Sequence, residues 1–123
     1  MSAITQNLSE SISSRTVIEL SPAWLGCISG LKAEKLLRNL KQAYLYVIRK
    51  GELENDYYIS YIDANMTIRH QPIVFSATPE GWCLENAAPY GPFASNITID
   101  DIAHLPMHCQ KEDCMPLINF QRS

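Results

Sequence analysis

Residues 44–50 read YLYVIRK, an apolar run that ends in two basic side chains. Successive side chains of a β-strand point to opposite faces, so Leu45, Val47 and Arg49 are predicted to share one face. An arginine on an inward face is costly to bury unless an anion meets its guanidinium group. The run therefore predicts a core strand with an anion-binding arginine near its end.

Two further strand-like runs follow after short polar segments. Residues 57–62 read YYISYI, and residues 66–70 read MTIRH. The connecting segments, 51–56 and 63–65, are short enough for antiparallel hairpins. The three runs therefore predict an antiparallel meander.

The third strand is expected to continue through residues 73–75. Proline has no N–H to donate to a ladder, so Pro72 is expected to bend this strand or to place it at an edge. After a turn, residues 82–84 are predicted to form one more short strand.

A helix is predicted before the first strand and a shorter one after the last. The first begins after Ser29, whose hydroxyl can cap it, and its apolar stripe is formed by Ala33, Leu36, Leu37 and Leu40. The second follows Thr98, with Asp100 and Asp101 in its first turn, and ends before Pro106. Residues 107–123 are expected to be irregular.

These elements predict an α+β fold with a central antiparallel β-sheet flanked by two α-helices. The chain has 123 residues, 46% of them hydrophobic, which suits one folded domain. We expect a flexible polar leader over residues 1–20, the domain over 21–118 and a C-terminal tail over 119–123.

Composition excludes several classes of protein. The formal net charge is −3, whereas nucleic-acid-binding proteins usually carry a basic excess, so no nucleic-acid partner is expected. No apolar run reaches the length of a membrane span, and the serine-rich start lacks the pattern of a signal peptide. The four cysteines are too scattered for a disulfide scaffold, which favours a reduced, intracellular protein.

The main alternative is a protein-interaction domain that is stabilised by zinc near its C-terminus and does not bind phosphate. His104, His108, Cys109 and Cys114 offer four side chains of the kind that bind zinc, although their spacing is not that of a standard finger. An enzyme is not expected, because glycine-rich phosphate loops, nucleophile elbows and the tyrosine-phosphatase cysteine–arginine spacing are all missing.

Ordered motifs over about residues 24–117 resemble the Src homology 2 (SH2) domain, the phosphotyrosine-binding module. They are Trp24, Gly26 and Ile28 before the first helix, Ala33-Glu34-Lys35-Leu36-Leu37 within it, Tyr46-Val47-Ile48-Arg49-Lys50-Gly51, Tyr58-Ile59-Ser60, His70, Gly81-Trp82-Cys83-Leu84 and Cys114-Met115-Pro116-Leu117. The resemblance implies a non-catalytic domain in which Arg49 anchors the phosphate and His70 lines the pocket.

This chain departs from the family pattern around the phosphate. Gly30 stands where many members have a first-helix arginine, and Gly51 replaces a serine. The loop carries Glu52, Glu54 and Asp56 where hydroxyl and basic residues are common. Four groups are left open as replacements: Lys50, Lys32, Ser29 and the backbone N–H groups near Gly51.

The resemblance also implies residues that set peptide preference. Gln71 follows His70 and is expected to meet residues beyond the phosphotyrosine, and Tyr90 and Phe93 lie in a long loop that could cover the ligand. We expect a monomer without cofactor or metal whose partners are tyrosine-phosphorylated proteins. The divergence is similar to that of SH2 copies in bacterial effectors, which would act in the host cytoplasm.

Overall fold

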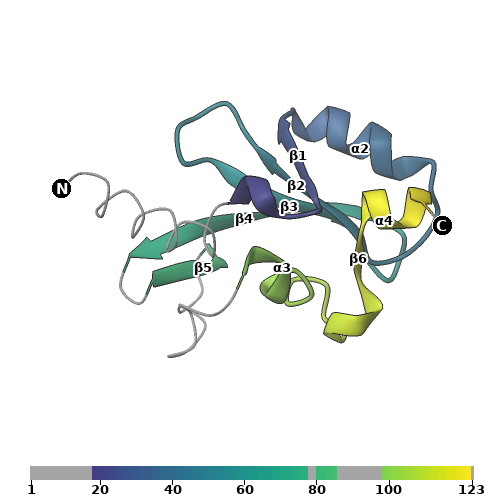
Figure 1. Cartoon of the computed structure of the whole chain (residues 1–123). Coiled ribbons are helices and arrows are strands. Elements are labelled where there is room, and N and C mark those ends of the chain that lie inside the picture. The colour runs from purple at the N-terminus through teal and green to yellow at the C-terminus, as the bar shows by residue number, and fades with distance from the viewer. Residues whose placement is uncertain (1–17, 78–79, 86–97, 123) are drawn as a thin grey trace.

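The sheet forms the centre of the molecule in a computed structural model that describes residues 18–77, 80–85 and 98–122 (Figure 1). Its strands are β1 (Trp24–Cys27), β2 (Leu45–Lys50), β3 (Tyr57–Ile62), β4 (Ile68–Ala77), β5 (Glu80–Leu84) and β6 (Met115–Pro116). They are ordered β1-β2-β3-β4-β5, and β6 also pairs with β2. The predicted meander is confirmed, because β2 through β5 pair antiparallel with their chain neighbours.

The described helices are short. The α-helices are α2 (Gly30–Arg38), α3 (Ile99–Ile102) and α4 (Leu117–Arg122), and the 3-10 turns are η1 (Ile18–Leu20) and η3 (Lys111–Asp113). The α+β class is therefore confirmed, with three α-helices in the described part of the chain rather than the predicted two.

The sheet is mixed, which corrects the expectation of a purely antiparallel one. Strand β1 runs parallel to the second half of β2, where Trp24 pairs with Ile48. Strand β6 runs parallel to its first half, where Met115 pairs with Leu45. The sequence did not indicate these pairings because they join segments that are far apart in the chain. In addition, two of these segments, β1 and β6, are only four and two residues long.

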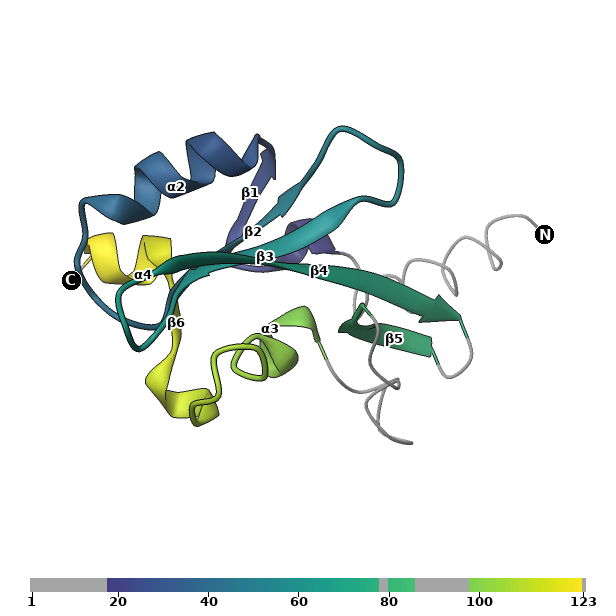
Figure 2. The same cartoon turned by 180° about the vertical axis from the view of Figure 1, so that it is seen from behind.

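Two apolar clusters pack against the sheet. One contains Ala33 and Leu37 of α2, Leu45 and Val47 of β2, and Leu117 of α4. The other contains Tyr46 and Ile48 of β2 together with Ile99 and Ile102 of α3. Alternate residues of β2 therefore face different clusters, as the period of two predicted. Figure 2 shows α2 and α4 near one another and α3 apart from them.

Helix α2 begins as predicted. The Ser29 hydroxyl accepts a hydrogen bond from the backbone N–H of Lys32 at 3.0 Å, which satisfies one early donor of the helix. Ala33 and Leu37 are fully buried against the sheet. Leu36 was expected in the same stripe, but it is exposed. The buried face of this short helix is narrower than the apolar pattern indicated.

Strand β4 continues through Pro72 and lies between β3 and β5, so the expected edge strand is wrong, whereas the expected bend stays a prediction. Pro72 pairs with Tyr58 inside the sheet, and its carbonyl accepts from the backbone N–H of Glu85 at 3.0 Å. Its carbonyl therefore faces the β5 side, just beyond the last residue of β5. The N–H and C=O groups of one residue in an antiparallel ladder point to the same side, so the missing N–H of Pro72 also belongs to the β5 side. Its absence therefore removes no hydrogen bond to β3.

The two ends of the predicted domain also need correction. Ile18 is buried in the cluster that contains α3, so the core begins before residue 21. Helix α4 covers much of the expected tail, and its Phe120 packs on the cluster that contains α2. Among the described residues, the structure has no helix long and apolar enough to cross a membrane.

Candidate functional site

Arg49 is buried on the sheet face that carries α2. Only 5% of its surface is exposed, so its inward orientation is confirmed. Its Nε donates to the Ser60 hydroxyl at 2.9 Å, and its Nη1 donates to the Ile28 carbonyl at 3.3 Å. Its Nη2 lies 3.3 Å from Nδ1 of His70. Neutral acceptors from three segments of the chain therefore hold the guanidinium in place.

His70 connects this arginine to helix α2. Its Nε2 lies 2.8 Å from the Glu34 carboxylate, and its Nδ1 lies 2.7 Å from the Ser60 hydroxyl. A carboxylate only accepts and a guanidinium only donates, so the network assigns the proton to Nε2 and leaves Nδ1 as an acceptor. Ser60 accepts from Arg49 and donates to His70. The four side chains thus form one continuous hydrogen-bond chain.

The guanidinium retains unused hydrogen-bonding capacity. It has five N–H groups, and the described residues accept three of them, one on each nitrogen. One donor on each terminal nitrogen is left. No described carboxylate forms an ion pair with Arg49. Two remaining donors on a permanent cation suit an anion with more than one oxygen.

A pocket of about 740 Å³ opens beside Arg49. Its walls come from the end of β1 and the residues that follow it, the start of α2, the end of β2, the β2–β3 turn, β3 and β4. The lining residues are Cys27, Ile28, Ser29, Gly30, Arg49, Gly51, Glu52, Leu53, Asp56, Tyr58 and His70. The Tyr58 ring lies against the guanidinium, with 4.4 Å between the ring centroid and Cζ of Arg49.

The first turn of α2 also faces this pocket. Ser29 and Gly30 line it, and no described residue accepts a hydrogen bond from the backbone N–H of Gly30 or of Leu31. A helix N-terminus carries a partial positive charge and binds anions through such groups. A Cβ added at Gly30 would lie 3.2 Å from Nη2 of Arg49, so this glycine lets the helix start approach the arginine closely.

The basic residues expected to assist Arg49 lie elsewhere. The Lys50 amine donates to the Leu53 carbonyl at 2.7 Å and lies 3.4 Å from that of Gly51. Neither Lys50 nor Lys32 lines the pocket. Ser29 does line it, and its hydroxyl hydrogen remains available because the helix cap uses the oxygen only as an acceptor. The backbone N–H of Gly51 donates to the Asp56 carbonyl.

Of the residues expected to set peptide preference, the structure describes only Gln71, and Gln71 does not line the Arg49 pocket. Gln71 alternates with His70 along β4, so the two side chains face opposite sides of the sheet, and its amide donates to the Pro72 carbonyl. Tyr90 and Phe93 lie outside the described residues.

Three residues of the site, Ser60, Tyr58 and Glu34, were not predicted from the sequence. Ser60 is fully buried beside apolar strand residues, and Arg49 pairs with Tyr58 in the register of β2 with β3. The signal for Ser60 was a small hydroxyl residue at an inward position of an apolar strand. The signal for Tyr58 was the hairpin register, whereas nothing local indicated Glu34.

Two factors act on the charge of Arg49: its burial, and carboxylates that lie nearby without forming an ion pair with it. Burial lowers the pKa of Arg49, while Tyr58, Asp56 and Glu34 act to raise it. The hydrogen bond from His70 is the main cause that holds the pKa of Glu34 below its usual 4.5. A hydrogen bond to Asp56 raises the pKa of the Tyr58 hydroxyl. Arg49 remains a cation in an environment that stabilises its charge only incompletely.

The residues of the zinc alternative do not form a metal centre. Within the part of the chain that the structure describes, no group of three or more histidine, cysteine or acidic residues could hold a metal ion. Burial is the main cause that raises the pKa of the Cys114 thiol to about 11. All four cysteines are free thiols.

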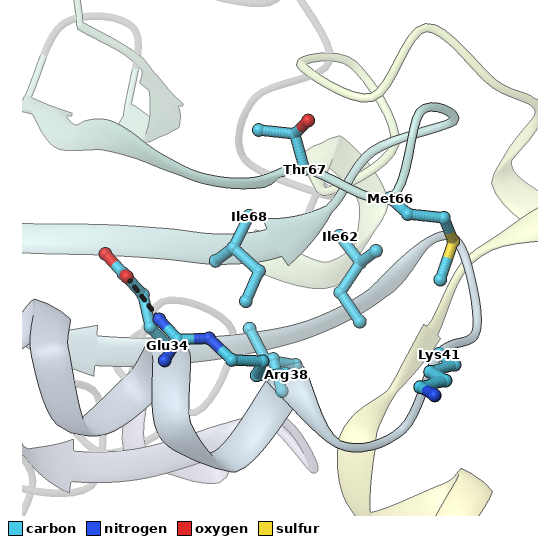
Figure 3. A pocket seen from close by; sticks show the side chains of 8 residues that line it. Glu34, Arg38, Lys41, Ile62, Met66, Thr67 and Ile68 are labelled. Carbon is cyan, nitrogen blue, oxygen red and sulfur yellow. Dashed lines mark hydrogen bonds and ion pairs between the residues drawn. The ribbon is translucent and has the colours of Figure 1, made fainter.

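A second pocket of about 310 Å³ lies farther along α2, toward its C-terminal end (Figure 3). Ile62 and Ile68 form its apolar floor, and Met66 and Lys41 lie at one end. Its arginine, Arg38, is paired with Glu34 at 3.2 Å and its side chain is 61% exposed. This pocket therefore has no buried cation: Arg38 is exposed and paired with Glu34, and Lys41 is exposed.

A scan against protein-family models and a search of curated proteins found no match to this chain.

Proposed function

We propose that this protein binds phosphotyrosine-containing peptides or proteins in the Arg49 pocket, without catalysis. In this proposal the fold is SH2-like, with the sheet flanked by α2 and α3. The observation that carries the proposal is the state of Arg49: it is buried, it makes no ion pair with a described carboxylate, and it keeps a free N–H donor on each terminal nitrogen.

The size and lining of the pocket support an aromatic phosphate ester as the ligand. A pocket of about 740 Å³ has room for a phosphorylated ring, and Tyr58 and Leu53 add apolar surface beside the cation. The residues that carry the resemblance to SH2 domains in this region, Arg49 and His70, lie within 3.3 Å of one another.

The start of α2 supports the same ligand where the family's helix arginine is missing. Ser29 and Gly30 line the pocket, and no described residue accepts a hydrogen bond from the backbone N–H of Gly30 or of the next residue, Leu31. Together they offer a phosphate oxygen the partial charge of a helix end in place of a full cation. Charge-assisted hydrogen bonds to Arg49 would then supply most of the affinity.

Retention on immobilised phosphotyrosine tests the proposal. We expect the protein to bind this resin, to elute with free phosphotyrosine and to ignore a tyrosine resin. The Arg49→Met variant, which keeps an unbranched side chain without the charge, is expected to flow through. Passage of the folded wild-type protein through the phosphotyrosine resin would overturn the proposal and leave Arg49 with a structural role.

The same preparation tests the zinc alternative through its metal content. We expect less than about one-tenth equivalent of zinc after dialysis, because the described histidines and cysteines do not assemble a site. Stoichiometric zinc whose removal unfolds the protein would favour the alternative instead.

A further inference from the structure

The charges that line the Arg49 pocket are unusual for a site that would receive a phosphate dianion. Arg49 is the only arginine or lysine among the lining residues, whereas two carboxylates, Glu52 and Asp56, line the same walls. The nearest lysine in sequence, Lys50, is held by carbonyl groups of the turn. The lining therefore carries more negative than positive charge.

One of these carboxylates is connected to the anion site itself. Asp56 hydrogen-bonds the hydroxyl of Tyr58, and the ring of Tyr58 lies against the guanidinium of Arg49. A Cβ added at Gly51 would meet Asp56 Oδ2, so the carboxylate folds back over the turn at the pocket wall. A ligand on Arg49 must approach within range of this charge.

A second negative charge on the ligand would gain little from Arg49. Arg49 has two free donors, and a singly charged ester with two or more oxygens can already accept both of them, with the start of α2 left for a further oxygen. The additional charge would be attracted by one cation and by the partial charge of the helix start, but it would be repelled by three full charges, those of Asp56, Glu52 and the nearby Glu34. Repulsion in a partly buried site is only weakly screened by salt.

We infer, in an extension that rests on the proposed function, that the Arg49 pocket selects an aryl ester that carries a single negative charge. Two ligands have this chemistry: a sulfotyrosine residue, and a phosphotyrosine residue whose phosphate keeps one proton. The dianion of phosphotyrosine is bound less tightly than either.

The experiment compares three peptides of one sequence, with phosphotyrosine, sulfotyrosine or tyrosine at the central position. Affinities are measured by calorimetry from pH 5 to pH 7.5, where circular dichroism confirms that the protein stays folded. The phosphate has a second pKa of about 6, so its singly charged form falls from about 90% at pH 5 to about 3% at pH 7.5. A sulfate ester keeps one charge throughout this range.

The sulfotyrosine peptide serves as the internal control for titration of the protein. The ionisable groups that face the ligand are Glu34 on α2, Glu52 and Asp56 in the turn, Tyr58 on β3, His70 on β4 and Cys27 on β1. Their protonation affects both esters, so the ratio of the two affinities isolates the proton of the phosphate.

We expect the affinity for phosphotyrosine, relative to sulfotyrosine, to fall by about thirtyfold from pH 5 to pH 7.5, in proportion to the singly charged form. A ratio that stays constant or rises with pH would show that the dianion binds at least as well, and would overturn the inference.

A charge-neutralising variant tests the cause. Asp56→Asn should strengthen phosphotyrosine binding at pH 7.5 by roughly tenfold, with a smaller gain for sulfotyrosine, because a dianion feels twice the repulsion. The matched control is Glu112→Gln, an exposed residue of η3 that does not line the pocket, and it should leave both affinities unchanged. An equal effect of Asp56→Asn on both esters would refute the role of Asp56.

The outcomes separate this inference from the proposed function. If neither ester binds better than the tyrosine peptide at any pH, both ideas fail. If phosphotyrosine binds through Arg49 and its advantage over sulfotyrosine grows with pH, the proposed function stands and the inference of charge selectivity is wrong.

Discussion

Each of the two pockets beside α2 contains an arginine, and the two arginines differ in burial and in ion pairing. In the pocket near the start of the helix, Arg49 is 5% exposed and hydrogen-bonds only neutral acceptors among the described residues. In the pocket near its end, the Arg38 side chain is 61% exposed and forms an i,i+4 pair with Glu34. Glu34 belongs to both regions, because it also meets His70.

The difference supports Arg49, and not Arg38, as the anion site of the proposed function. Arg38 is solvated and paired, so an anion would have to compete with water and with Glu34 for a modest gain. Arg49 has already lost most of its hydration, and Ser60 and His70 hold it in one orientation. An anion that reaches Arg49 gains strong charge-assisted bonds with little further ordering.

The largest expected effect comes from removing each arginine in turn. Arg49→Ala should weaken phosphotyrosine-peptide binding by about a hundredfold or more, because a pair of charge-assisted hydrogen bonds is lost. Arg38→Ala should leave the affinity within about twofold. Titration calorimetry measures both, and thermal melting confirms the fold. Near-normal affinity in folded Arg49→Ala would remove the basis of the comparison.

A smaller effect is expected from a change at Ser60, which accepts a hydrogen bond from Arg49. Ser60→Ala leaves Nε of Arg49 without its acceptor and removes the shorter of the two contacts to Nδ1 of His70, which should cost about 1–2 kcal/mol in free energy of unfolding. Binding should weaken by about tenfold, because Arg49 loses its fixed orientation. Ser60→Thr keeps the hydroxyl and serves as the control in urea unfolding and in titration. Equal stability of the alanine variant would show that Ser60 does not support Arg49.

Gly51→Ala probes the wall of the pocket. The added Cβ would clash with the carboxylate of Asp56, so that side chain must move and the β2–β3 turn must adjust. We expect a loss of about 1 kcal/mol in stability, the lower end for overpacking. Chemical denaturation measures it, with Gly51→Ala/Asp56→Ala as the relieving double variant. No recovery in the double variant would contradict the assigned clash.

Lys50→Ala tests whether a cation that is next to Arg49 in sequence, but does not line the pocket, contributes to binding. Its amine donates to the Leu53 carbonyl and does not line the pocket, so the affinity for phosphotyrosine peptides should fall by less than about threefold. Lys32→Ala, at an exposed helix position, is the matched control. A tenfold loss in Lys50→Ala alone would show that its amine turns to the ligand on binding.

The smallest expected effect concerns the pH dependence of Glu34, the residue that the two regions share. His70 and Arg38 hold its folded pKa below 4.5, so its contribution to stability is present above the unfolded pKa. That contribution is lost as the pH falls through the folded pKa. The difference in stability between wild type and Glu34→Gln should therefore shrink below about pH 4 in urea titrations. A difference that is unchanged at low pH would contradict this assignment.

Much of the fold could be predicted because its causes are local. The strand period placed Leu45, Val47 and Arg49 on one face, short polar turns indicated the hairpins, and Ser29 marked the start of α2. Each of these features depends on residues within one strand, one turn or one helix end. The sequence by itself therefore determined the antiparallel meander and the inward orientation of Arg49.

The tertiary structure alone decided what surrounds that arginine. The hydrogen bonds that link Arg49, Ser60, His70 and Glu34 join residues that are 10 to 36 positions apart in the sequence. Only the strand register and the docking of α2 bring these residues together. The same packing set β1 and β6 parallel to β2. Such contacts depend on which distant segments meet, because local periodicity fixes the face of a residue but not its partner.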